Sequence, residues 1–311
     1  MEFGRVAENK LESIDFSLPA EPVANKPFLN KSNQNPHVYI GCAKWGRKEW
    51  VGKIYPKRTK ATQFLEYYIK NYNSIELNST YHNLLGPEEI SKWAVQAKGK
   101  DFKFCPKFNK LITHEREFID VGSATEKFFE GIFAFGENLG PIFLQVSESY
   151  HPDKRDKLFN YLKTLPANLQ FFLEVRHPLW FANASIRQEL FDALREMNIG
   201  AVITDTASRR DCAHMELTTS KTFIRYVGNS LHETDYARVD AWVERMKYWL
   251  SNGLQELYFF MHMHDETYSP ELTVYLVDKM NSECALHLPK PQFIQTSLFS
   301  QFDVARKRKT E

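Results

Sequence analysis

Short apolar runs alternate with segments of helical periodicity along most of this chain. The clearest run is 171–180, which begins with near-continuous apolar residues, as in a strand buried on both faces, and then presents Glu174, Arg176 and His177. Pro178 removes a backbone donor and ends the strand. The same sequence of apolar run, polar exit and helix recurs. Strands are predicted over 38–43, 74–81, 102–107, 142–146, 171–180, 200–205, 221–228 and 256–265, and helices over 62–71, 88–96, 125–138, 153–164, 185–197, 235–250 and 270–280.

Eight strand signals with helices between most of them predict an α/β fold, a single (β/α)8 TIM-type barrel over residues 37–290. Residues 1–36 contain four prolines among polar residues and are predicted to form a flexible arm, extended or partly disordered. Residues 291–311 form a C-terminal tail, whose basic run 306–309 is expected to be a solvated charge run. The alternative is a doubly wound sheet, but 41–46 does not match the G-x-G-x-x-G turn that such a fold usually carries.

The composition is that of a globular protein. The chain has 311 residues, 43% of them hydrophobic and 25% charged, with a net charge of +1. That balance provides no global basic field, so a nucleic-acid partner is unsupported. No apolar stretch is long enough to span a membrane, and four scattered cysteines lack a C-x-x-C pair. A cytoplasmic location is the expectation, and the oligomeric state is not indicated.

Charged residues stand at the ends of the predicted strands. In a parallel barrel these ends meet at one mouth, so the six are expected to lie together: Glu76, Lys107, Glu174, Arg176, Asp205 and Arg225. Buried charges need partners, and two interpretations are open. The first is an acid/base and anion-binding site. The second is an internal lattice of salt bridges without catalysis.

The first interpretation assigns roles to these side chains. Glu174 or Glu76 acts as a base, with Asp205 as a further catalytic carboxylate, and His177 or His114 moves protons. Lys107, Arg176 and Arg225 hold the negative group of a small anionic or sugar-like ligand, because arginine matches phosphate and carboxylate. The amides Asn78 and Gln145 and the aromatic residues Trp45, Tyr81, Trp180 and Tyr226 complete the expected ligand-binding set. A bulge after Arg176 would turn His177 towards the mouth. Such an enzyme would be a hydrolase, lyase or isomerase.

Histidines raise a metal-dependent alternative. His262 and His264 share one strand face, and His114 and His177 stand at other strand exits, but there is no H-E-x-x-H signature. No cofactor is predicted. A divalent metal, in a phosphodiesterase built like the endonuclease IV-type barrels, is one alternative, and a non-catalytic module that binds a ligand or nucleic acid is another.

Several separate motifs together resemble one family. The chain from about Val38 to Leu276 is similar to the YecE-like proteins, known as domain-of-unknown-function family seventy-two. The resemblance implies a TIM-type barrel and implies no activity, because none is established for the family. One departure is that 260–265 reads Phe-Met-His-Met-His-Asp where many members end this strand in Phe-Asn-Asn. The matching motifs are 40–45, Trp50, 55–56, 75–81, 112–114, 139–141, Gln145, 174–177, Trp180 and 225–226.

Overall fold

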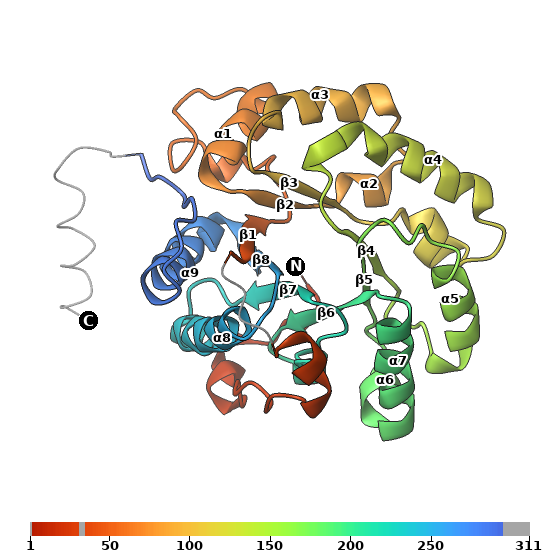
Figure 1. The fold of residues 1–311 in the computed structure, drawn as a ribbon. Helices are drawn as coiled ribbons and strands as arrows, with labels where there is room; N and C mark the ends of the chain where they lie inside the picture. The colour runs from red at the N-terminus through yellow and green to blue at the C-terminus, as the bar shows by residue number, and fades with distance from the viewer. Residues whose placement is uncertain (1, 31–34, 295–311) are drawn as a thin grey trace.

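Eight parallel strands form a ring that is surrounded by helices (Figure 1). The computed structural model describes residues 2–30 and 35–294. The strand order is β3-β2-β1-β8-β7-β6-β5-β4, and each neighbouring pair is parallel. The strands are β1 (His37–Cys42), β2 (Ser74–Leu77), β3 (Lys103–Pro106), β4 (Ile142–Gln145), β5 (Phe171–Glu174), β6 (Gly200–Asp205), β7 (Lys221–Gly228) and β8 (Glu256–Met263).

The two ends of this sheet meet between β3 and β4. Isolated bridges join Phe104 to Leu139 and Lys107 to Phe143, so the ring is nearly closed. The predicted TIM-type barrel is therefore confirmed. Because all neighbouring strands are parallel, their carboxyl ends lie at the same end of the barrel, which we call its mouth.

Helices form the outer layer (Figure 1). They are α1 (Phe64–Asn71), α2 (Ser79–His82), α3 (Pro87–Ala97), α4 (Gly122–Ile132), α5 (Arg155–Leu162), α6 (Leu179–Ala182), α7 (Ala184–Glu196), α8 (Glu233–Ser251) and α9 (Ser269–Glu283). Shorter turns are η3 (Lys48–Trp50), η4 (Ala61–Gln63), the π-helical η5 (Leu111–Glu115), η6 (Phe133–Asn138), η7 (Pro152–Lys154), η8 (Arg210–Cys212) and η9 (Glu266–Tyr268).

Three predicted strands or helices differ from the structure. The strand expected over 171–180 ends at Glu174, and the short helix α6 begins at Leu179. The strand expected over 74–81 ends at Leu77, and the short helix α2 follows. The Thr80 hydroxyl donates to the carbonyl oxygens of Leu77 (3.0 Å) and Lys107 (2.8 Å). These bonds stabilise a turn at a place where the alternation of polar and apolar residues in the sequence predicted a longer strand. The helix expected over 125–138 is divided: α4 ends at Ile132, the 3-10 helix η6 follows, and within η6 Gly136 adopts a non-helical φ of 53°.

Strand alternation divides the core into two parts. Side chains facing outward pack under the helices, while aromatic residues such as Phe143, Phe172, Phe223 and Phe260 fill the barrel interior. Residues two positions further along these strands are polar: Gln145, Glu174, Arg225 and His262. A polar layer therefore lies above an aromatic floor at the carboxyl end of the barrel.

The described part of the N-terminal arm contacts the barrel. It contains the short 3-10 helices η1 (Glu8–Ser13) and η2 (Val23–Phe28). Asn25 is fully buried, and its side chain bonds to the backbone of Met215 and Leu217. Phe3 and Leu11 are also buried, a packing that the polar, proline-containing composition did not indicate. The predicted solvated run 306–309 lies outside the described residues.

No helix within the described ranges is both long and apolar enough to cross a membrane.

Candidate functional site

Arg225 joins two buried carboxylates at the centre of the barrel. Its Nε and Nη2 donate to Glu76 (2.8 and 2.9 Å), and its Nη1 donates to Glu174 (2.6 Å). Three strands on different sides of the ring supply these groups: β2, β5 and β7. Neutral donors complete the shell, since Thr204 Oγ1 donates to Glu174 (3.1 Å) and Asn78 Nδ2 to Glu76 (3.0 Å). We call these residues, with His262, Arg176, Lys107 and Gln145, the inner cluster.

Both carboxylates of the inner cluster are held in the charged form. Burial alone would raise the pKa of Glu174, but the adjacent Arg176 and Arg225 outweigh it and lower the pKa to about 2. Burial is likewise outweighed at Glu76, whose pKa is held well below its usual range by Arg225 and by His262. The His262 Nε2 lies 2.9 Å from Glu76 Oε2. These carboxylates are therefore anions engaged by fixed donors.

Arg176 follows β5 and is only partly paired. Its Nε donates to Glu174 (2.7 Å), but its buried Nη2 has no hydrogen-bond partner among the residues that the structure describes. Glu148 lies 3.8 Å from Nη1, yet that carboxylate is 62% exposed, so solvent screens the attraction. The ring of Phe3 covers the guanidinium, with its centroid 4.0 Å from Cζ. A residue of the N-terminal arm thus lies directly on this arginine.

Lys107 is a buried lysine whose hydrogen-bond partner is a neutral side chain. It extends from the end of β3, is 7% exposed, and its Nζ donates to the Gln145 side-chain oxygen (2.8 Å). Its Nζ also lies 4.3 Å from the centre of the Tyr81 ring. No carboxylate in the described part of the chain forms an ion pair with it. Burial, reinforced by Arg225 and Arg176 and opposed by the two glutamates, lowers the pKa of Lys107 to about 7.

Tyr81 and His114 border this lysine. Their rings meet edge to face at 5.2 Å, and the His114 Nδ1 lies 2.8 Å from the Thr113 hydroxyl. Burial, and then the charges of Lys107 and Arg176, lower the pKa of His114 to about 4. His114 is therefore neutral at pH 7 and has one ring nitrogen engaged by a neighbour.

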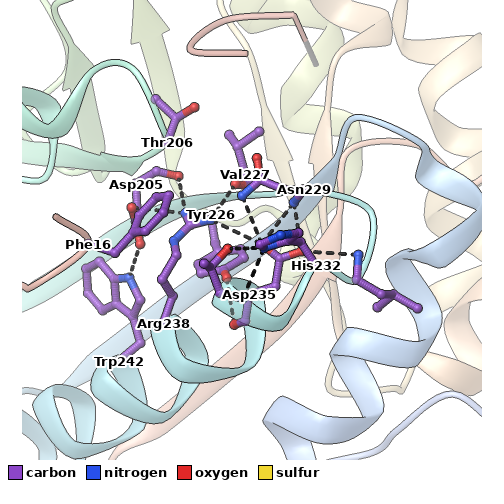
Figure 2. A network of polar contacts seen from close by, with 12 residues as sticks. Phe16, Asp205, Thr206, Tyr226, Val227, Asn229, His232, Asp235, Arg238 and Trp242 are labelled. Carbon is purple, nitrogen blue, oxygen red and sulfur yellow. Dashed lines mark hydrogen bonds and ion pairs between the residues drawn. The ribbon is translucent and has the colours of Figure 1, made fainter. Parts of the chain in front are cut away.

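Asp205 and Tyr226 are not part of the inner cluster. They pair in register as the outward neighbours of Thr204 and Arg225, so alternation places them on the opposite face of the sheet. Figure 2 shows them beside Arg238 and Trp242 of α8. The expectation that Asp205 lies at the mouth with the other charged residues is corrected by this geometry.

These outward residues form a second network, which we call the outer cluster. Arg238 contacts Asp205 (3.0 Å) and Asp235 (3.3 Å), and Trp242 Nε1 donates to Asp205 (2.6 Å). Arg210 also pairs with Asp205, and the Tyr226 hydroxyl donates to the Asp235 carbonyl oxygen (2.9 Å). Burial is again outweighed by Arg238 and Arg210, so the pKa of Asp205 is lowered. This network ties β6 and β7 to α8 (Figure 2).

The remaining aromatic candidates lie apart from one another. Trp180 is fully buried and donates its indole N–H to the Tyr150 carbonyl oxygen (3.0 Å), which is a structural contact. Trp45 is half-buried and packs edge to face on Trp93 at 5.1 Å. It lines a cavity of about 240 Å³ that also reaches Asn78, and thus touches the edge of the inner cluster.

His177 is partly exposed on the loop after β5. Its Nδ1 accepts the backbone N–H of Leu179 (3.3 Å), and its ring lies against His151 at 4.8 Å. Burial, together with the charges of His151 and Arg209, lowers its pKa. None of these contacts is with the inner cluster, so its proton-transfer role stays a prediction.

Thr204 and Phe3 were not among the residues predicted for this site, and His262 was considered only as a metal ligand. Thr204 and His262 each follow an interior apolar residue of their own strand by two positions, Val202 on β6 and Phe260 on β8, so strand alternation would have indicated both. Phe3 carries no local signal, since its place on Arg176 depends on the path of the arm. Within residues 2–30 and 35–294, no group of three or more His, Cys, Asp or Glu side chains is placed to hold a metal ion.

Comparisons with known proteins agree on one family. The family model described as "Protein of unknown function DUF72" matches residues 39–294. The UPF0759 protein YecE of Escherichia coli K12 is 27% identical over 253 residues, which is 76% of this chain and 89% of that protein. A DUF72 family protein from Enterococcus faecalis V583 superposes with a TM-score of 0.60 at 12% identity, covering 84% of this chain and all of that one. One from Thermotoga maritima MSB8 gives 0.58 at 21%, covering 79% and 98%.

Proposed function

Because this chain belongs to the DUF72 family, whose description names no activity, we propose a function from the inner cluster itself. The protein is an enzyme that binds a small anion, bearing a phosphate or carboxylate, at the carboxyl strand ends and acts on it by acid/base chemistry. One observation carries the proposal: Lys107 is buried near Arg176, and no carboxylate of residues 2–30 or 35–294 forms an ion pair with it.

A count of charges supports anion binding. Three basic side chains of the inner cluster, Arg225, Arg176 and Lys107, face two buried carboxylates, Glu76 and Glu174. A buried unpaired cation is costly, so a lysine in this position favours either its neutral form or a bound anion. The buried, unpartnered Nη2 of Arg176 supplies a donor of fixed direction for such an anion.

The same geometry distributes the chemical roles. Glu76 and Glu174 are anions engaged by Arg225, so in this proposal they position the cations rather than remove protons. Lys107, with a pKa of about 7, exchanges a proton near neutral pH and acts as the general acid or base. Neutral His114, which meets the ring of Tyr81, connects this region to solvent as a proton relay.

Calorimetric titration with inorganic phosphate and with pyruvate tests the binding. Arg176→Gln and Lys107→Met are expected to weaken binding at least about tenfold, because each removes a charge-assisted contact. Arg155→Gln, which breaks an exposed pair with Glu189, is the matched control and leaves affinity unchanged. Bound anion raises the pKa of Lys107, so wild-type affinity falls as pH rises above about 7, and Lys107→Met loses this dependence.

A screen of phosphate- and carboxylate-bearing metabolites, read by thermal shift and then by NMR for product, tests the chemistry. Turnover in the wild type that is lost in Lys107→Met supports the proposal. Anion binding that is absent, or that is equal in the wild type and Arg176→Gln, contradicts it.

A further inference from the structure

We propose that Lys107 is an imine-forming amine, and that the substrate class of this site is a small carbonyl compound that also bears a carboxylate or phosphate. This inference rests on the proposed function, because Arg176 and the inner cluster provide the anion binding. The inference adds a covalent step to the proposed function. Anion binding alone would require only that Lys107 be positively charged.

The contacts of Lys107 leave its nitrogen available as a nucleophile. A carboxylate partner would hold a lysine in its protonated form, in which no lone pair is free. Lys154 has such a partner, since its Nζ lies 2.7 Å from Glu117, and Lys221 lies 2.6 Å from Glu256. The partner of Lys107 is instead the neutral side-chain oxygen of Gln145 (2.8 Å). Lys107 therefore differs from these lysines in chemistry as well as in burial.

The surroundings of Lys107 also favour the neutral amine. Below it lies the Phe143 ring, whose centroid is 5.9 Å from Nζ, and beside it the Tyr81 ring at 4.3 Å. Burial and the nearby guanidinium groups lower its pKa to about 7, so a substantial fraction is unprotonated at neutral pH. Desolvation next to other cations is the established way in which proteins activate a lysine amine towards carbonyls.

The reaction can be balanced with groups at hand. The lone pair of Nζ forms a bond to the carbonyl carbon while the C=O π pair moves to oxygen, giving a carbinolamine after proton transfer from nitrogen to oxygen. Protonation of that hydroxyl then releases water, and the nitrogen lone pair forms the C=N bond of a protonated imine. One amine, one carbonyl and one proton thus give one iminium and one water. His114, beyond Tyr81, is the nearby neutral residue suited to pass these protons.

Arg176 defines the second half of the substrate. Its unpartnered Nη2 and the excess positive charge of the inner cluster would hold the acidic group while the carbonyl meets Lys107. A neutral carbonyl compound lacks that anchor and is expected to react poorly. The geometry therefore selects compounds such as 2-oxo acids and keto or aldehyde phosphates.

Reductive trapping on the full-length wild-type protein tests this inference. The protein is incubated at pH 7 with pyruvate or dihydroxyacetone phosphate and sodium cyanoborohydride, and adducts are located by peptide mass spectrometry. We expect Lys107 to be modified at least about tenfold faster than Lys154, because the lowered pKa of Lys107 leaves a larger fraction of it unprotonated than is usual for an exposed lysine. Neutral hydroxyacetone should show no such preference for Lys107. Arg176→Gln should reduce the preference for the anionic probes.

The outcomes separate the two proposals. If Lys107 is trapped no faster than Lys154 with either probe, while pyruvate or phosphate still binds in an Arg176-dependent manner, the imine is refuted and the anion-binding function stands. If neither probe nor phosphate binds, both proposals fail. Since trapping is read on the wild type, the result does not depend on whether a Lys107 variant folds.

Discussion

The inner and outer clusters are built from the same parts but differ in how completely they are paired. In each, one buried arginine bridges two carboxylates: Arg225 between Glu76 and Glu174, and Arg238 between Asp205 and Asp235. In the outer cluster the remaining contacts come from Trp242 and from backbone N–H groups such as that of Asn229 (Figure 2). The partly exposed Arg210 also pairs with Asp205. In the inner cluster a second guanidinium and a lysine are added without further buried acid.

An unpartnered guanidinium nitrogen does not by itself distinguish the two. Arg238 Nε, like Arg176 Nη2, is buried without a hydrogen-bond partner. The difference lies in Lys107, whose protonated form adds a positive charge that no further buried carboxylate of the inner cluster matches among the described residues. Both clusters therefore contain buried polar groups. Only the inner cluster has an excess of basic over acidic side chains, and this excess is what favours binding of an anion there.

The largest expected effects come from removing the bridging arginines. Arg225→Met and Arg238→Met each leave two buried carboxylates without their main partner, and each should lower the free energy of unfolding by about 3–5 kcal/mol. Denaturant titration measures this. Only Arg225→Met should also weaken phosphate binding, because Glu76 and Glu174 would then engage Arg176 and Lys107.

A smaller matched pair extends this test if the arginine variants do not fold. Thr204→Val and Trp242→Phe each remove a hydrogen bond to a buried carboxylate and should cost about 1–3 kcal/mol. If an outer-cluster variant, Arg238→Met or Trp242→Phe, lost phosphate binding, that result would contradict the assignment of anion binding to the inner cluster alone.

The sequence predicted the barrel because its strands are continuous apolar runs, and it predicted most of the inner cluster because charged residues end those runs. The prediction was wrong where a residue's position depends on whether its side chain faces the barrel interior or the surrounding helices. Asp205 ends β6 and Tyr226 lies two residues before the end of β7, but each comes one position after an inward-facing residue, Thr204 or Arg225, and so faces outward. Counting inward- and outward-facing positions along each strand could have shown that Asp205 and Tyr226 face outward. The position of Phe3 on Arg176 could not be predicted, because the path of the arm depends on tertiary contacts.

Lys107 should make the stability of the inner cluster depend on pH in a direction opposite to that of a paired lysine. Its folded pKa of about 7 lies below the 10.5 of an exposed lysine, so the unfolded chain binds more protons between these values. The penalty of burying the charge is complete below about pH 7 and is relieved as pH rises towards 10.5. Groups that face Lys107 are Glu76, Glu174, Arg176, Arg225, Tyr81 and His114.

The comparison that isolates this effect is the difference in unfolding free energy between wild type and Lys107→Met. The wild type should gain stability relative to the variant from about pH 7 to about pH 9.5, where histidines and carboxylates no longer titrate. A difference that stays constant with pH, or that falls, would mean that Lys107 is charged and paired in the folded protein. The variant Lys154→Met, from an ordinary ion pair, should show no such gain.

The smallest expected effects concern the N-terminal arm, which places one phenylalanine on an arginine of each cluster and so allows the two clusters to be compared directly. Phe3 covers Arg176 at 4.0 Å, whereas Phe16 covers Arg238 at 4.8 Å. Each stacking contact is worth about 0.5–2 kcal/mol, so Phe3→Ala and Phe16→Ala should destabilise the protein by similar small amounts. Phe3 covers one face of the Arg176 guanidinium, so removing this ring is expected to open the approach to the in-plane N–H groups that would hold an anion, whereas no ligand is expected at Arg238. Calorimetry should therefore show severalfold tighter phosphate binding in Phe3→Ala and unchanged binding in Phe16→Ala. Equal affinities in both variants would place the anion away from the face that Phe3 covers.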